Sequence, residues 1–201
     1  MTAAAATDEL ALLASIGIQV GAARAGELRA AGARVARRLH AGGHRIVGLV
    51  PADDRVAVPA VAIHLGLALC ELTGGTVAVV DANVRYPGLM ELARGRDADA
   101  GSSRFATRWL RDSLALMTPP RATSAGEVVR LARALDAGAG LFGHVLCDLT
   151  GFDLLGEHAT AAACMDAVAI VGRVHQTRVA RLRQLAALMP ADRFLGVLLV
   201  G

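Results

Sequence analysis

Two aspartates lie at the ends of predicted strands, where a carboxylate could bind a cation or take part in catalysis. Asp81 and Asp148 each follow an apolar run, 76–80 and 144–147, that predicts a buried strand. Carboxylates at the ends of parallel strands meet at the edge of the sheet where doubly wound folds bind ligands. There they could orient water or hold a cation weakly, or they could cap loops and helix N-termini without any ligand. Both interpretations stay open from the sequence.

A further acidic group lies in the run 51–57, between a predicted strand at 45–50 and a predicted apolar helix at 58–72. A phosphate-binding loop at such a place reads G-x-x-x-x-G-K-[ST]. Its glycines let backbone N–H groups converge on phosphate oxygens, its lysine reaches the β- and γ-phosphates, and its hydroxyl binds Mg²⁺. Here Ala57, Val58 and Pro59 occupy the positions of the last glycine, the lysine and the hydroxyl.

The charges in this run also argue against a phosphate-binding loop. Asp53 and Asp54 place negative charge where a triphosphate needs positive charge, and Arg55 is the cation beside them. The chain contains no lysine, and all 21 of its basic residues are arginine. A genome-wide preference for arginine explains that absence but does not explain valine at position 58. The sequence therefore predicts no tight binding of ATP, no cofactor and no metal.

The rest of the chain alternates between strand and helix patterns. Such alternation predicts right-handed crossovers and a doubly wound, mostly parallel sheet with helices on both faces. We expect one domain over 1–201, with a helical segment at 1–43 and an α/β core at 44–201. The predicted helices are 7–16, 20–41, 58–72, 124–137, 157–164 and 177–188; the predicted strands are 45–50, 76–81, 114–117, 144–148, 166–171 and 194–200; and 94–108 is a predicted mobile loop.

Composition limits the setting of the chain. A hydrophobic content of 54% in 201 residues suits one sizeable core, and a net charge of +3 is too small to indicate nucleic acid by itself. The three cysteines lie in apolar runs without metal-ligand spacing, which is typical of buried reduced thiols in a cytosolic protein. No run is long and apolar enough to span a membrane, and the N-terminus lacks the charge pattern of a signal peptide.

Three stretches carry a resemblance to a known family. Residues 77–89 follow the pattern apolar strand, D-x-D, apolar, R-x-P, with Asp81, Arg85 and Pro87 matching and Asn83 in place of the second acid. Residues 142–150 resemble a Walker B strand that ends at Asp148, and the last two predicted strands fit as well. The chain is similar to the MinD/ParA branch of P-loop ATPases, most of all to the cytoplasmic domain of bacterial tyrosine kinases of exopolysaccharide and capsule export.

The resemblance implies a P-loop NTPase-like fold in which the nucleotide site is degenerate. We expect a catalytically inactive domain, a pseudo-ATPase, that acts as a protein-interaction or regulatory module of a membrane-associated complex in polysaccharide export or cellular positioning. It would lie in the cytoplasm, including the inner face of the membrane. The positions of the degenerate site are Asp53, Asp54, Arg55, Val58, Pro59, Asp81, Asn83, Arg85 and Asp148.

The expected partner is a different protein, with at most a weak homodimer. The kinases' N-terminal oligomerisation motif, E-x-x-R-x-x-R, aligns with Ala23, Gly26 and Arg29, so only its last arginine remains. We expect partner contacts through Arg29 and Arg34 of helix 20–41 and through the loop 94–108. Two alternatives stay open: an active ATPase or tyrosine autokinase with an irregular loop, and a DNA or membrane-surface binder that uses its arginines.

Overall fold

One seven-stranded sheet organises the described part of the chain. The structure is a computed structural model, and it describes residues 21–83, 89, 106–118, 127–138, 140–152 and 156–201, together with 11 and 14. The strands run in the order β3-β4-β2-β5-β1-β6-β7, and every neighbouring pair is parallel except β3 and β4. Their bounds are β1 Ile46–Pro51, β2 Val77–Asp81, β3 Ala106–Leu110, β4 Leu114–Thr118, β5 His144–Asp148, β6 Ala167–Arg173 and β7 Phe194–Val200.

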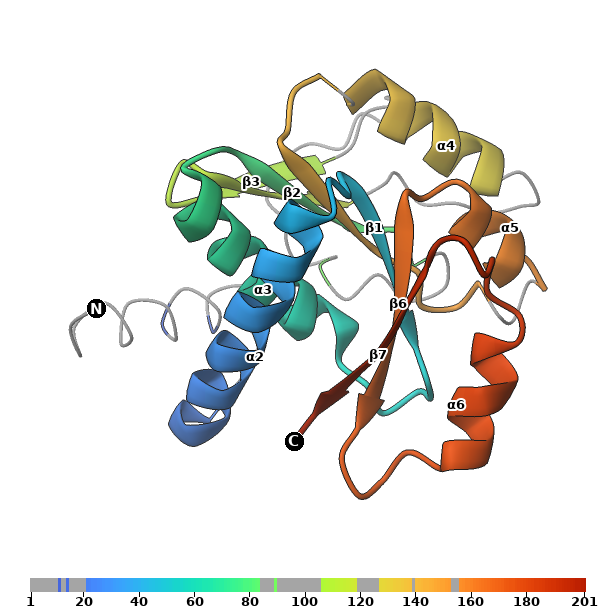
Figure 1. The fold of residues 1–201 in the computed structure, drawn as a ribbon. Coiled ribbons are helices and arrows are strands. Elements are labelled where there is room, and N and C mark those ends of the chain that lie inside the picture. Colours follow the sequence, from blue (N-terminus) through green and yellow to red (C-terminus); the bar gives the residue numbers. More distant parts are fainter. Residues whose placement is uncertain are drawn as a thin grey trace.

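Helices cover both faces of this sheet (Figure 1). One core contains side chains of α2 and α3, and the second contains side chains of α4, α5 and α6. The two inner strands β2 and β5 are buried along their whole length, as expected for parallel strands with helices on both sides. The helices are α2 Ala22–Ala41, α3 Val58–Thr73, α4 Glu127–Gly138, α5 His158–Ala163 and α6 Val179–Ala186.

The pair α2 and α3 packs closely because one position has no side chain. A Cβ atom added to Gly32 of α2 would stand 3.1 Å from the backbone oxygen of His64 in α3. Small residues at a helix crossing let the two backbones approach in this way. The apolar helix α3 ends at Gly74, whose φ of 66° is the left-handed conformation that favours glycine at a helix end.

The predicted fold class is confirmed, and the strand and helix predictions agree with the structure at most places. The prediction of a loop over 94–108 is wrong at its C-terminal end, because β3 begins at Ala106. β3 pairs antiparallel with β4 through a tight turn in which Arg111 and Asp112 have φ of 52° and 56°. Hairpin turns of this kind usually carry Asn-Gly or Asp-Gly, so Arg-Asp gave no signal.

Three sequence predictions are not tested by the described residues. The loop at 94–105 and most of the expected helix 7–16 lie outside them. The division into 1–43 and 44–201 stays a prediction. Within the described residues, no helix is long and apolar enough to cross a membrane.

Candidate functional site

The connection between β1 and α3 is the feature on which a nucleotide site would depend. Three of the backbone N–H groups at this connection donate to carbonyl oxygens of the protein itself. Ala52 N donates to the oxygen of Val171 at 2.8 Å, Val56 N donates to the oxygen of Asp53 at 3.3 Å, and Val58 N donates to the oxygen of Val56 at 3.0 Å. A phosphate cradle needs such groups to point at one common anion. These three do not.

The carboxylate of Asp53 accepts two hydrogen bonds at this connection. Its Oδ1 accepts a hydrogen bond from Arg55 N at 3.1 Å, and its Oδ2 accepts one from the hydroxyl of Thr177 at 3.0 Å. The Thr177 oxygen in turn accepts a bond from Arg173 N at 2.8 Å. This chain of three bonds ties residues 52–57 to the segment between β6 and α6, so the connection is closed by the protein's own charge.

The start of α3 is apolar where a kinase or ATPase would be charged. Val58 is fully buried, with 0% of its surface exposed, and belongs to the same core as Val56 and Leu49. The helix begins after Ala57, which provides no side-chain cap, and Pro59 occupies the first turn as predicted. Val58, for which the sequence predicts the lysine position of a phosphate loop, is therefore a core residue whose side chain is shielded from solvent.

The two strand-end aspartates lie side by side. Asp81 and Asp148 are opposite each other in the parallel register of β2 and β5, and both are buried. Asp81 accepts hydrogen bonds from Asn83 N at 3.2 Å and Leu89 N at 2.7 Å. Asp148 Oδ1 accepts bonds from the N–H and the hydroxyl of Thr150, while its Oδ2 is buried and has no hydrogen-bond partner.

Burial governs the charge of Asp148. Loss of solvation is the largest influence and raises the pKa of Asp148; the two bonds from Thr150 lower it and the negative charge of Asp81 raises it, and together they bring the pKa to about 7. None of these influences is a positive charge. Near neutral pH, and without a bound cation, this group is therefore a mixture of acid and carboxylate. Among the described residues, no cluster of three His, Cys, Asp or Glu side chains could hold a metal ion.

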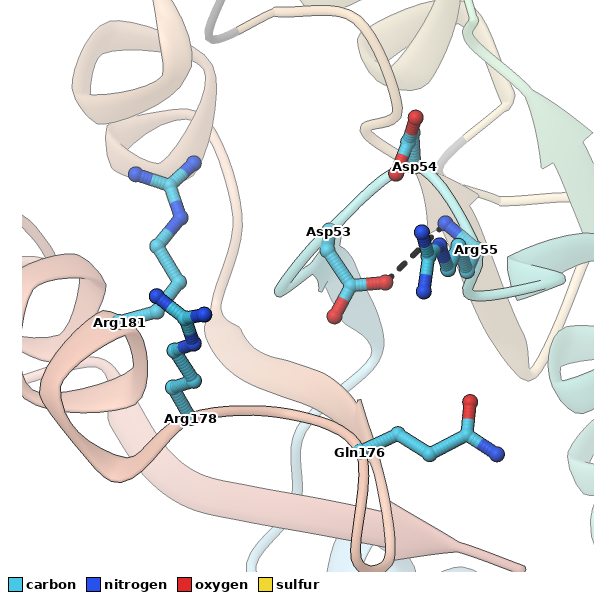
Figure 2. Close-up of a pocket in the computed structure, with 6 residues that line it drawn as sticks. All are labelled: Asp53, Asp54, Arg55, Gln176, Arg178 and Arg181. Carbon is cyan, nitrogen blue, oxygen red and sulfur yellow. Dashed lines mark hydrogen bonds between the residues drawn. The ribbon is translucent and has the colours of Figure 1, made fainter.

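A pocket of about 250 Å³ opens beside the β1–α3 connection. Figure 2 shows Arg178 and Arg181 on one side of it, Arg55 on the other and Asp53 between them. Arg181 is partly fixed because its Nε donates to the oxygen of Ala52 at 3.1 Å. The lining residues are Asp53, Asp54, Arg55, Gln176, Arg178 and Arg181.

The predicted site residues thus fall into three groups. Asp53, Asp54 and Arg55 gather at the pocket, Val58 and Pro59 lie in and beside the core, and Asp81, Asn83 and Asp148 gather at the strand ends. Arg85 lies outside the described residues. Sequence reasoning missed the part played by Thr177, Gln176, Arg178 and Arg181, since nothing in the chain indicates that residues 124 positions apart meet.

On α2, the two predicted partner-binding residues differ. Arg34 is exposed, as are Arg37 and Arg38 beyond it. Arg29 is half-buried, and its Nε is enclosed. Arg34 is therefore available to a partner, while a change at Arg29 would also disturb the packing of the helix.

This architecture is that of P-loop NTPase-like domains, with a mostly parallel sheet and acids at the ends of β2 and β5. No family model matches the sequence, and no curated protein matches it. Among solved structures, the fold is similar to the tyrosine kinase domain of BceF, with a TM-score of 0.66 and 15% identity over 88% of this chain and 77% of that one. It is also similar to the kinase domain of VpsO, with a TM-score of 0.67 and 14% identity over 88% of this chain and 95% of that one.

A ParA family ATPase from Chlorobium tepidum is similar as well, with a TM-score of 0.55 and 17% identity over 78% of this chain and 73% of that one. At these identities the comparisons show a shared fold. The chain has the fold of bacterial tyrosine kinase domains and ParA-family ATPases, as the sequence motifs predicted.

Proposed function

We propose that this domain is a catalytically inactive counterpart of the kinase and ATPase domains whose fold it has, and that it works by binding another protein. The single observation that supports this most is the position of Asp53. Its carboxylate takes the Arg55 N–H and the Thr177 hydroxyl that face the connection where phosphates would have to bind. A polyanionic nucleotide would have to displace a charge that belongs to the protein itself.

The neighbouring positions support the same proposal. Phosphoryl transfer depends on positioned cations and N–H donors around the transferred group. In this chain a buried valine stands at the lysine position, and Asp53 and Asp54 repel phosphate at short range. The domain would then serve as a regulatory or interaction module of a membrane-associated complex, in polysaccharide export or cellular positioning, with its place in the cytoplasm or at the inner face of the membrane.

Titration calorimetry with ATP, ADP and GTP at millimolar magnesium tests the loss of nucleotide binding. We expect no heat of binding at micromolar protein and no release of phosphate in a coupled assay. Micromolar affinity together with measurable turnover would refute the proposal.

A second function is favoured by one observation. Arg55, Arg178 and Arg181 line the 250 Å³ pocket next to the connection, and guanidinium groups bind phosphate well. An active nucleotide-binding domain that uses these arginines in place of lysine would show binding in the same calorimetry. Arg55→Ala and Arg178→Ala should then abolish the binding, whereas under the first proposal neither variant has binding to lose.

The partner surface we propose is the exposed face of α2 around Arg34. Arg34→Glu combined with Arg37→Glu should prevent co-purification of the partner from the native host and leave the melting temperature within a few degrees of wild type, because both side chains are exposed. Arg133→Glu with Arg183→Glu provides a matched control, since these exposed arginines lie on α4 and α6. Retention of the partner by the α2 variant would exclude this surface.

A further inference from the structure

Among the described residues, the edge strand β7 buries only one of its two faces. Leu198 and Val200 face the core that contains side chains of α2 and α3. Val197 and Leu199 alternate with them, so they face the other side of the sheet, and they are 42% and 49% exposed. Strands of a parallel sheet are normally covered by helices on both faces. One face of β7 is therefore left open.

Helix α6 stands beside this open face. It packs on β6 and β7, and Figure 1 shows it alongside both strands. A Cβ atom added to Gly172 of β6 would stand 3.3 Å from Leu199 Cδ2 and 3.4 Å from Leu182 Cδ2 of α6, so these two leucines share one side of the sheet. Val179 lies one turn before Leu182, on the same side of α6, and is 61% exposed. We call Val179, Val197 and Leu199 the β7–α6 face.

The border of the β7–α6 face is positively charged. Arg178 and Arg183 flank Val179 on α6, and both are exposed. Neither α6 nor β7 contains an acidic residue, and Asp192, just before β7, already forms an ion pair with Arg193 at 3.6 Å. Arg183 follows Val179 by one turn and so lies on the same side of the helix. An occupant of this face would therefore gain from acidic side chains next to its apolar ones.

The shape of this surface favours a helix as its occupant. A strand added to the edge of β7 would pair with its backbone and leave the side chains of the face exposed. A flat lipid surface would meet α6 first, because that helix stands on the same side of the sheet and projects beyond it. A helix next to α6 covers the side chains directly, as helices cover sheets in α/β domains. The seven residues of β7 extend over about 23 Å, which a helix of about 15 residues spans.

A second copy of this chain is a poor occupant of the β7–α6 face. The exposed sides of its described helices α2 and α4 carry arginines, among them Arg34, Arg37 and Arg133. These would meet Arg183 as like charges. A helix with the complementary charge therefore belongs to a different polypeptide.

We propose that the β7–α6 face binds an amphipathic helix of another protein. The apolar stripe of that helix packs on Val179, Val197 and Leu199, and its acidic side chains pair with Arg183. This inference rests on the proposed role in protein binding and names a contact surface separate from the one on α2. The nucleotide titration tests the loss of catalysis independently of it.

The test uses the intact chain and a peptide of about 15 residues with a stripe of leucines, glutamates on both borders of the stripe and alanines elsewhere. A lactam bridge between side chains one turn apart on its outer side keeps the peptide helical. Anisotropy of a dye on the peptide gives the affinity. One control peptide has lysine in place of glutamate, and a second has the same composition with the leucines distributed around the helix. Trp109, the only tryptophan, lies on the opposite edge strand β3, so its emission reports binding near that edge instead.

We expect the glutamate peptide to bind roughly tenfold or more tightly than either control peptide, without a change in the emission of Trp109. Val197→Asp and Val179→Asp should each weaken binding roughly tenfold or more, a loss typical of a central interface residue. Val129→Asp is the matched control, because Val129 is a 55% exposed valine on α4. Arg183→Glu should reverse the preference, so that the lysine peptide binds more tightly than the glutamate peptide. The melting temperature shows that each variant is folded.

Four outcomes of the peptide titrations would overturn the proposal. They are no binding of the glutamate peptide, equal binding of a control peptide, unchanged binding by Val197→Asp and Val179→Asp, and an unchanged preference in Arg183→Glu. Two further results would overturn it by identifying another occupant. A dimer of the free chain that Val197→Asp dissociates would assign the face to a second copy, and binding to phosphatidylglycerol vesicles that the same change abolishes would assign it to a membrane.

Discussion

The free energy of unfolding of this domain should depend strongly on pH through Asp148, and Asp148→Asn should remove most of that dependence. Burial raises the pKa of Asp148 to about 7, against 3.8 for an ordinary aspartate. A carboxyl group whose pKa is higher in the folded state stabilises the fold fully below its unfolded pKa and loses that contribution as pH rises through its folded pKa. At about 1.36 kcal/mol per pKa unit, the wild type loses about 4 kcal/mol between about pH 4 and pH 8 at this group.

That loss is large compared with the roughly 5–15 kcal/mol by which domains are stable. Asparagine has nearly the shape of aspartic acid, and its side-chain oxygen can still accept the Thr150 N–H, but it does not ionise. Its amino group would lie where Asp148 Oδ2 has no hydrogen-bond partner, at a cost of about 1–3 kcal/mol that is independent of pH. The free energies of unfolding of the wild type and the variant are therefore compared at several pH values. The change of their difference with pH reports the ionisation of Asp148, and its value at one pH does not.

Urea unfolding of the wild type and Asp148→Asn at about pH 4, 6 and 8, with EDTA present, measures this difference. We expect the free energy of unfolding of the variant, relative to that of the wild type, to rise by about 3–4 kcal/mol from the lowest to the highest pH. Asp192→Asn is the control, because the Asp192 side chain is 78% exposed and should show no comparable trend. A difference for Asp148→Asn that stays constant within about 1 kcal/mol would mean that Asp148 is ionised throughout, and the reasoning from burial would fail.

Three further changes test packing in the candidate site and between α2 and α3. Val58→Lys should lower the free energy of unfolding by about 3 kcal/mol or more in urea without creating ATP binding in calorimetry, because the position is fully buried; tight ATP binding by this variant would contradict that. Thr177→Val should cost about 1–2 kcal/mol in urea because it leaves Asp53 without its hydroxyl donor, and an unchanged stability would show that solvent replaces the bond. Gly32→Ala should lower stability by about 1–3 kcal/mol, since its Cβ would stand 3.1 Å from the His64 oxygen; a neutral result would mean that α2 can shift away from α3.

The sequence predicted the sheet and the places of Asp81 and Asp148 because both depend on local patterns. Apolar runs between helical segments identify the strands, and the end of each run gives the edge at which its aspartate lies. The burial of Val58 also agrees with the apolar pattern of the helix that follows it. These features need no knowledge of which distant residues meet.

The remaining features depend on contacts between distant segments. The bond between Asp53 and Thr177 joins two polar residues that are 124 positions apart, and either residue alone reads as an ordinary loop or helix-start residue. Arg55 was a predicted site residue, but nothing local in the sequence indicates that Arg178 and Arg181 lie at the same pocket. β3 was hidden because Ala-Thr-Arg-Trp-Leu lacks a clear alternation and because its turn uses Arg111 and Asp112 at positive φ.

Two features of the site, the hydrogen bonds of Asp53 in the β1–α3 connection and the raised pKa of Asp148, both fit a site without a lysine at position 58. In a working phosphate loop, backbone N–H donors and a lysine bind the phosphate anion. The positive charge of the lysine also lowers the pKa of nearby carboxyl groups, so that they stay ionised. Here a buried valine stands at the predicted lysine position, and none of the described residues that act on the pKa of Asp148 carries a positive charge. Asp53 meanwhile supplies an anion for the Arg55 N–H and the Thr177 hydroxyl. A lysine at position 58 alone would therefore not create a nucleotide site, because that position is buried and because Asp53 already provides an anion for these donors.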